Sequence, residues 1–147
     1  MPKLSFERRV PHAPERMFAL VADLEDYPRF IPNCSAMSVR PAGEPDTVLA
    51  EMTIRFGPIT QSYLSRVTLD REGMAIRAVA QRGLFRHLDS TWRFEPEGEG
   101  TLIRFDIDFK IANPLIAAVA EPAFGQKQDE IMNAFVAEAS RRFASAP

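Results

Sequence analysis

The 147-residue sequence predicts an α+β fold, in which a curved antiparallel sheet of about seven strands wraps around one long C-terminal helix. Two observations favour this class. The region from Asn113 to Ala144 places apolar residues at helical spacing, and the region before it alternates apolar and polar side chains in short runs separated by turn residues. Such a sheet has one apolar face that needs a cover, and the long helix can provide it.

The chain begins with a predicted strand over Lys3–Val10, where Leu4 and Phe6 alternate with polar or charged residues. A short helix is expected from Pro14 to about Asp23, because proline is well tolerated in the first turn of a helix. A second short helical turn is expected after it. Two short helices therefore follow the first strand.

The segment Asp23–Cys34 has two prolines close together, which excludes a long helix. Tyr27, Phe30 and Ile31 give it a large apolar surface, so we expect it to be pinned over the sheet. Two readings stay open for this segment. It is either a plug that closes one end of the core or a lid over a pocket.

Six further strands are predicted from period-two alternation, and the last of them has the clearest pattern. The turns between them contain glycine, and Gly73 is expected to take a left-handed conformation in its hairpin loop. The predicted strands are Ser35–Arg40, Thr47–Phe56, Thr60–Asp70, Met74–Gln81, His87–Glu95 and Ile103–Lys110.

The C-terminal helix is expected to break near Glu121–Pro122, because proline removes a backbone donor and clashes with the preceding turn. Before the break, the apolar residues lie on a different face from the apolar band that follows it. Gln128 falls inside that band. It either sits at the edge of the band, bonded to backbone or water, or points a polar group into a cavity.

Composition excludes several classes of function. The formal net charge of −2 gives no bias toward nucleic acid, so no DNA partner is expected. Cys34 is the single cysteine, which excludes an internal disulfide, and His12 and His87 alone do not make a metal site. Neither a membrane-spanning run nor a signal-like N-terminus is present. We expect a single domain over residues 1–147, cytoplasmic, with no cofactor and no metal.

A twisted sheet curled around one helix leaves a space between the two layers, and here that space is expected to be apolar. The alternative is a filled core without a ligand. The residues expected to line the space are Phe30, Ile31, Met52, Ile54, Phe56, Tyr63, Trp92, Phe94, Phe105, Ile107, Phe109, Phe124, Gln128, Ile131, Met132 and Phe135.

Three stretches carry a family resemblance that covers nearly the whole chain. The first is Val21–Cys34, with its valine, aspartate, tyrosine, phenylalanine, proline and cysteine. The others are Gly83–Leu88 followed by Trp92-Arg93-Phe94, and the last strand with Asn113-Pro114-Leu115, Phe124-Gly125 and Ala134-Phe135. In this order they resemble the coenzyme Q-binding branch of the helix-grip, START-like superfamily, which also includes ribosome-association toxins. Asn33 departs from the pattern, because the family often has an aromatic residue there.

The resemblance implies a non-enzymatic protein that binds ubiquinone or a related polyprenyl lipid in an apolar tunnel and supports respiratory electron transfer. Tyr63, Gln128 and Arg93 are candidates to orient the quinone head. Leu84 and Phe85, flanked by basic residues, are predicted to form an exposed tip that docks transiently on a membrane. Peripheral association with the inner membrane would follow.

Two alternatives remain. The toxin branch implies a module that binds a ribosomal subunit through a basic surface. The wider superfamily implies a cyclase-type enzyme, which needs a general acid or base in the cavity. The phases of Glu51, Asp106 and Asp108 point these carboxylates outward, which weighs against the enzyme.

Overall fold

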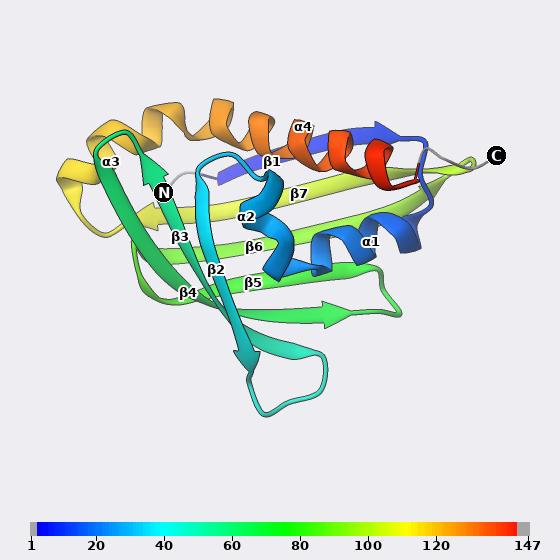
Figure 1. The fold of residues 1–147 in the computed structure, drawn as a ribbon, viewed down its shortest axis with the longest axis horizontal. Coiled ribbons are helices and arrows are strands. Elements are labelled where there is room, and N and C mark those ends of the chain that lie inside the picture. The colour runs from blue at the N-terminus through cyan, green and yellow to red at the C-terminus, as the bar shows by residue number, and fades with distance from the viewer. Residues whose placement is uncertain (1–2, 144–147) are drawn as a thin grey trace.

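The computed structural model describes residues 3–143, and its sheet has seven strands in the order β1-β7-β6-β5-β4-β3-β2 (Figure 1). Every neighbouring pair is antiparallel. The predicted α+β helix-grip fold is confirmed. The strands are β1 Lys3–Val10, β2 Cys34–Pro41, β3 Thr47–Phe56, β4 Ile59–Asp70, β5 Ala75–Gly83, β6 Phe85–Glu97 and β7 Gly100–Ile111.

Helices cover one face of this sheet. The long helix α4 (Phe124–Phe143) runs along it near β1 and β7, while α1 (Pro14–Ala22) lies nearer β5 and β6 (Figure 1). The short elements η1 (Leu24–Asp26) and α2 (Tyr27–Phe30) follow α1 and reach α4. The predicted helical end at Ala144 lies outside the described residues.

The C-terminal helical region is interrupted as its proline predicts. Helix α3 (Pro114–Ala120) passes into a single turn, η2 (Glu121–Ala123), before α4 begins. Asn113 caps α3, because its Oδ1 accepts hydrogen bonds from the backbone N–H groups of Leu115 at 2.8 Å and Ile116 at 3.4 Å. The break lets α3 turn away from α4.

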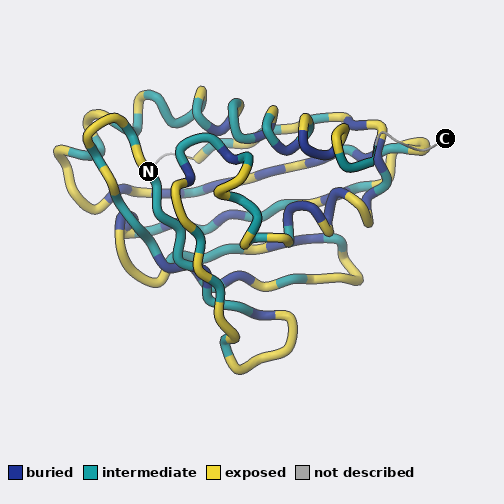
Figure 2. Tube along the Cα trace, viewed as in Figure 1, coloured by how far each residue is buried: buried dark blue, intermediate teal, exposed yellow. Residues whose placement is uncertain are grey.

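The core lies between the sheet and the helices, where inward-facing residues of β6, β7 and α4 are buried (Figure 2). Ile103 and Phe109 from β7 and Ala139 from α4 are fully buried. The alternation predicted for the last strand is therefore confirmed.

The hairpin between β4 and β5 differs from the prediction. Gly73 has no positive φ, and Met74 takes the left-handed conformation instead, with φ of 51°. The Gly73 N–H donates to Asp70 Oδ1 at 2.9 Å, and a Cβ on Gly73 would lie 2.4 Å from Asp70 Oδ2. The short contact is with the end of the flexible, exposed Asp70 side chain, so neither the φ angle nor a rigid neighbour requires glycine here.

The predicted membrane-docking tip at Leu84 and Phe85 is wrong, because both side chains are only 6% exposed. Gly83, with φ of 108°, turns the chain back against β4, and the Leu84 N–H donates to the Ser62 carbonyl at 3.0 Å. The Phe85 ring then packs edge-on against Tyr63, with 4.9 Å between ring centroids. The connection from β5 to β6 thus folds its apolar residues inward.

Candidate ligand-binding cavity

A cavity of about 170 Å³ lies between α4 and the sheet. Residues from β2 through β7 form its floor and walls, α4 forms one side, and the segment from η1 to β2 covers it. Leu24, Tyr27 and Ile31 of this segment contact the cavity, so of the two readings for residues 23–34 the covering lid is supported.

Most residues predicted to line this space do so, and they come from elements far apart in the sequence. Gln128 is among them: it is buried, and among residues 3–143 no group hydrogen-bonds to its side chain. The second reading of Gln128, a polar group directed at a cavity, is supported. The predicted residues that line the cavity are Ile31, Met52, Ile54, Phe56, Tyr63, Trp92, Phe105, Ile107, Phe124, Gln128, Ile131 and Phe135.

Other predicted lining residues are core residues instead. Phe94 packs edge-on against Phe18 of α1, with 6.0 Å between centroids. Phe109 is fully buried and stacks on Phe124 at 4.0 Å, so Phe124 stands between it and the cavity side of the layer. The prediction was wrong for these residues because alternation gives the face of a strand, not which neighbour covers each side chain.

Two predictions on helices were also wrong. Phe30 packs edge-on against Phe135, with 5.6 Å between centroids, and lies under the Arg29 and Arg142 guanidinium groups. Met132 is buried within the core and does not contact the cavity. The polar candidate Arg93 is exposed on the other face of β6, as its phase requires, and cannot orient a ligand in the cavity.

Residues that the sequence reasoning missed are mainly small, polar or on the lid. Ala50, Ser65 and Ser90 share the inward phase of predicted neighbours, so alternation alone could have identified them. The missed lining residues are Val21, Leu24, Tyr27, Pro32, Asn33, Met37, Ala50, Ser65, Val67, Ile76, Ala78, Phe85, Leu88, Ser90, Ala120 and Lys127.

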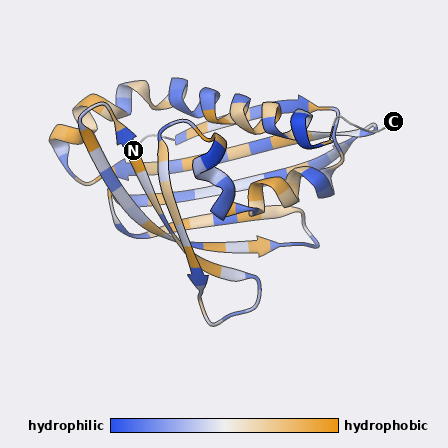
Figure 3. Cartoon of the chain, in the orientation of Figure 1, coloured by the Kyte–Doolittle hydropathy of each residue, from blue (hydrophilic) through white to orange (hydrophobic). Residues whose placement is uncertain are grey.

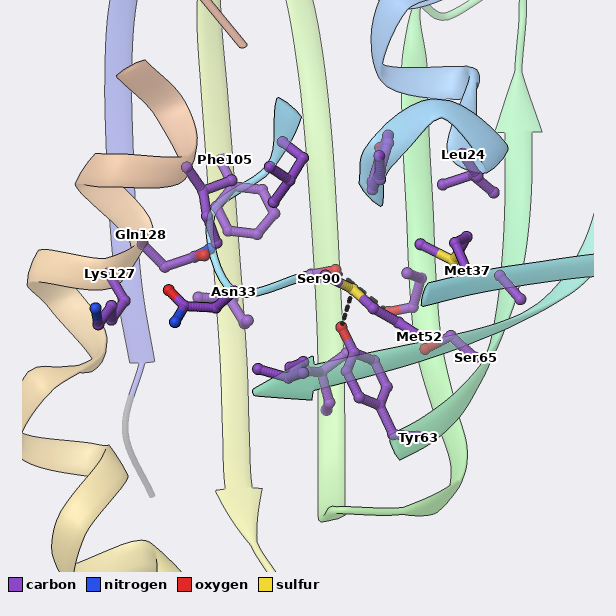
Figure 4. A pocket seen from close by; sticks show the side chains of 18 of the residues that line it. Leu24, Asn33, Met37, Met52, Tyr63, Ser65, Ser90, Phe105, Lys127 and Gln128 are labelled. Atoms are coloured by element: carbon purple, nitrogen blue, oxygen red, sulfur yellow. Dashed lines mark hydrogen bonds between the residues drawn. The ribbon is translucent and has the colours of Figure 1, made fainter. Parts of the chain in front are cut away.

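Few polar atoms face the cavity (Figure 4). The Tyr63 hydroxyl donates to Met52 Sδ at 3.3 Å, and Ser90 Oγ donates weakly to the Ala78 carbonyl at 3.5 Å. Ser65 Oγ is buried and has no hydrogen-bond partner within the described part of the chain. Ser65 therefore adds to the mostly apolar lining a buried hydroxyl that has no partner among residues 3–143.

The ionisable lining groups do not suit acid–base catalysis. Burial raises the pKa of Tyr27 and of Tyr63 well above the usual range for a phenol, so both stay protonated near neutral pH. The Tyr27 hydroxyl is occupied as a donor to the Val21 carbonyl. The lining residues include no carboxylate, imidazole or thiol; Lys127 is the remaining ionisable group.

The residues singled out for chemistry lie elsewhere. His87 Nε2 is 3.5 Å from Asp108 Oδ2, and neither residue lines the cavity. His12 packs against Phe143, with 5.7 Å between ring centroids. Burial raises the pKa of the Cys34 thiol, which makes it a poor nucleophile. Within residues 3–143, no group of three or more His, Cys, Asp or Glu could hold a metal.

We infer that the cavity opens at Lys127, because this charged residue lines the cavity while its side chain is partly exposed and lies 3.9 Å from Glu130. Asn33 also lines the cavity (Figure 4). Asn33 adopts a left-handed φ of 68°, which asparagine tolerates better than an aromatic residue, and its Nδ2 donates to the Arg55 carbonyl at 2.8 Å. This bond ties the lid to the end of β3.

The lid is held to α4 by charged groups. Glu138, buried on α4, accepts hydrogen bonds from Arg141 at 2.6 Å, from Arg142 at 2.7 Å and from Arg29 of the lid. Arg142 also pairs with Asp26 of η1. These hydrogen bonds, Arg141 first, hold the pKa of Glu138 well below its usual range.

This fold defines a helix-grip protein of the START-like class, in which a sheet and a long helix enclose an apolar cavity. Residues 10–136 match the family model described as polyketide cyclase / dehydrase and lipid transport. The chain belongs to this family.

Named relatives fall into two groups. Ribosome association toxin RatA of Rickettsia prowazekii is 32% identical, over 90% of this chain and 93% of that protein. The mitochondrial coenzyme Q-binding protein coq10 of Schizosaccharomyces pombe is 27% identical, over 90% of this chain and 83% of that protein. Among solved structures, the ZhuI aromatase/cyclase of Streptomyces sp. R1128 has a TM-score of 0.84 at 17% identity, covering 99% of each chain. That likeness shows the fold alone.

Proposed function

We propose that this protein binds ubiquinone or a related polyprenyl quinone in its cavity and carries it without chemical change, in support of respiratory electron transfer. The quinone ring occupies the cavity, and the polyprenyl tail leaves through the mouth beside Lys127. The name of the Schizosaccharomyces pombe relative, a coenzyme Q-binding protein, supports this choice of ligand.

The unpartnered Ser65 hydroxyl in an apolar cavity is the observation that carries this proposal. A buried donor without a partner costs about 1–3 kcal/mol, which a ligand acceptor recovers on binding. A quinone offers a flat ring with carbonyl acceptors and no charge. Gln128, on the α4 side of the cavity, supplies a second possible donor.

The size of the cavity supports a binding mode in which the quinone ring, rather than the polyprenyl tail, occupies it. A cavity of about 150 Å³ holds one benzene-sized ring, so about 170 Å³ is suited to a single ring rather than a ring with a long tail. The isoprenoid units near the ring contact Phe124, Ile131 and the lid. Burial of their apolar surface contributes about 25 cal/mol per Å².

A cavity-filling substitution tests the site. Ala78 lines the cavity, so Ala78→Phe should fill it and lower ubiquinone binding at least about tenfold, since the ring and the new side chain compete for the same volume. The matched control is Ala36→Phe, on an exposed position of β2. Binding is measured by quenching of Trp92 fluorescence. Equal affinity of both variants, each with a native thermal transition, would contradict the site.

A second function, binding to a ribosomal subunit, is favoured by the name of the RatA relatives, ribosome association toxin. It requires a surface rather than a cavity. Cosedimentation with purified ribosomal subunits separates the two: ribosome binding predicts that Ala78→Phe cosediments like the unsubstituted protein, whereas quinone carriage predicts no cosedimentation.

Cyclase-type catalysis is the least supported function. The solved aromatase/cyclase shares the fold, but the cavity lining here includes no carboxylate, imidazole or thiol to move a proton. We therefore infer a binding protein. Cytoplasmic location with peripheral contact to the inner membrane is the setting that such a carrier requires.

A further inference from the structure

Helix α3 presents an apolar face to solvent. Leu115 and Val119 are 81% and 62% exposed, and they lie about one helical turn apart on the same side. The whole of α3 carries no charged residue (Figure 3). Its other side, with Ile116 and Ala117, packs against the core, and Ala120 lines the cavity. Folding therefore anchors this helix and leaves two large aliphatic side chains unpartnered beside the mouth.

Basic residues surround the same end of the sheet. Helix α3 follows β7, whose end pairs with the start of β6 at Phe85–Ile111, and the β3–β4 hairpin turns at this end too (Figure 1). None of Arg55, Arg82, Arg86 and Lys110 forms an ion pair with a residue in the described range. The basic residues at this end are Arg55, Arg82, Arg86, Lys110 and Lys127, all exposed except Lys127, which is half-buried.

Acidic groups at this end do not cancel this charge. Glu121 is turned inward, where its carboxylate accepts from the Ile111 N–H at 3.4 Å. Asp108 lies between Lys3 and His87. Glu130 is within 3.9 Å of Lys127, and the exposed Asp129 lies beside it on α4, so Glu121, Asp129 and Glu130 offset three of the five basic charges. A net positive rim therefore surrounds an exposed aliphatic patch.

We propose that this end of the molecule docks on an anionic lipid bilayer, with Leu115 and Val119 inserted among the acyl chains and the basic residues against the headgroups. Apolar residues flanked by cations are the combination that binds the interface of an anionic membrane. RNA would use the charges but would leave the aliphatic pair exposed to water. A bilayer accounts for both features, whereas RNA accounts only for the charges. This docking surface is a property of the protein beyond the identity of its ligand.

Docking in this orientation would also place the cavity mouth against the membrane. Lys127 and Ala120 belong both to the cavity lining and to this end, so a docked molecule faces its mouth to the membrane. An apolar ligand can then move between bilayer and cavity without crossing water. The buried Leu84 and Phe85 contribute nothing to this surface.

Vesicle binding of the full chain tests the proposal. Vesicles of phosphatidylglycerol with phosphatidylethanolamine should bind the protein, and vesicles of phosphatidylcholine alone should bind it at least about tenfold less. Leu115→Ser with Val119→Ser should lower binding to the anionic vesicles at least about tenfold. Arg86→Glu with Lys110→Glu should lower it by a similar factor, and added salt should weaken binding of the unsubstituted protein.

The matched control is Arg8→Glu with Arg40→Glu, which makes the same charge change at the other end of the sheet. Arg8 pairs with Ile103, eight residues along β7 from Ile111, which is about 26 Å and more than two Debye lengths, so this control should bind within about twofold of the unsubstituted protein. Circular dichroism checks that every variant is folded. Solvent extraction of the same samples reports bound quinone separately, so a missing ligand and a missing membrane contact are distinguishable.

Three results would overturn the proposal. The first is unchanged vesicle binding by the folded Leu115→Ser, Val119→Ser variant. The second is an equal loss of binding in the Arg8→Glu, Arg40→Glu control. The third is that Arg86→Glu with Lys110→Glu abolishes cosedimentation with ribosomal subunits while no form of the protein binds vesicles, which would assign the basic rim to RNA.

Discussion

At the scale of single residues, only a small number of polar atoms in the cavity lining could form hydrogen bonds with a ligand. Ser65 Oγ has no partner in the described chain, whereas the neighbouring Ser90 and Tyr63 hydroxyls donate to protein atoms. A hydroxyl buried without a partner lowers the stability of the protein that carries it. Its presence in an apolar wall is consistent with a role in binding rather than in folding.

Ser65→Ala should therefore have opposite effects on stability and on binding. Removing the unpartnered hydroxyl should leave the free energy of unfolding unchanged or raise it slightly, while quinone affinity should fall by about 1–2 kcal/mol. Urea denaturation and ligand titration measure the two quantities. Ser38→Ala, on an exposed position of β2, is the control. An affinity equal to that of the control would argue against a hydrogen bond from Ser65.

Residue-scale prediction from sequence succeeded for large inward-facing side chains. Met52, Trp92 and Ile107 were identified because alternation gives the face of a strand. It failed for Phe109 and for Phe85, because the stacking of Phe124 over Phe109 and the turn at Gly83 depend on contacts between distant segments. It also passed over Ala50 and Ala78, whose small size makes room for the cavity.

At the scale of elements, the lid and α4 act as a clasp that depends on charge. The Glu138 carboxylate accepts from guanidinium groups of both α4 and the lid, and Arg142 reaches back to Asp26. Apolar contacts reinforce it, since the Tyr27 ring packs on Phe135 with 5.3 Å between centroids. The lid is therefore held in place on α4. Because the arginines are partly exposed, water can compete for the hydrogen bonds that hold it.

Glu138→Gln should loosen the lid, because it removes the charge that three arginines share. Hydrogen bonds to charged groups are worth about 1.5–3 kcal/mol, and partial exposure of the arginines lowers this, so we expect a loss of about 1–2 kcal/mol in unfolding free energy. Amide hydrogen exchange over residues 24–33 should rise. Glu130→Gln, on the exposed side of α4, is the control; protection equal to the control would contradict the clasp.

The pH dependence follows from the lowered pKa of Glu138. Its pKa in the unfolded chain is near the usual 4.5 and lies lower in the folded protein, so its contribution to stability is complete above about pH 5.5. The contribution is lost as pH falls below 4.5 toward the folded-state pKa. The stability difference between the protein and Glu138→Gln should be constant at neutral pH and shrink below pH 4.5. A constant difference down to pH 3 would contradict this.

Sequence also anticipated the break before α4, since Pro122 interrupts any continuous helix. It did not anticipate that α3 leaves Leu115 and Val119 in solvent. That outcome depends on where η2 directs the chain, which no local pattern specifies. An apolar residue in a helix is usually buried, so the exposure of Leu115 and Val119 was visible only in the folded molecule.

No helix within residues 3–143 is long and apolar enough to span a membrane.

At the scale of the whole molecule, fold class was the most predictable feature. Strand alternation, turn residues and one long amphipathic helix all favour the same two-layer arrangement. A fold can be predicted from sequence when such independent signals agree. A cavity was predictable only in general terms. Its position results from the curvature of the sheet and from the lid, both of which are tertiary features.

The features that bear on function are also distributed unevenly along the molecule. One end combines the cavity mouth, the exposed face of α3 and the basic residues, while the clasp around Glu138 closes the lid farther along α4. This arrangement suits a carrier that takes an apolar ligand from a membrane and holds it away from water.

The most direct test of quinone carriage is the identity of what the protein binds in its own cells. The protein is purified under mild conditions and extracted with organic solvent, and the extract is analysed by mass spectrometry, with Ala78→Phe prepared in parallel. We predict about one ubiquinone-type polyprenyl quinone per chain for the unsubstituted protein and at least tenfold less for Ala78→Phe. An extract without quinone, or equal amounts from both proteins, would contradict the proposed function.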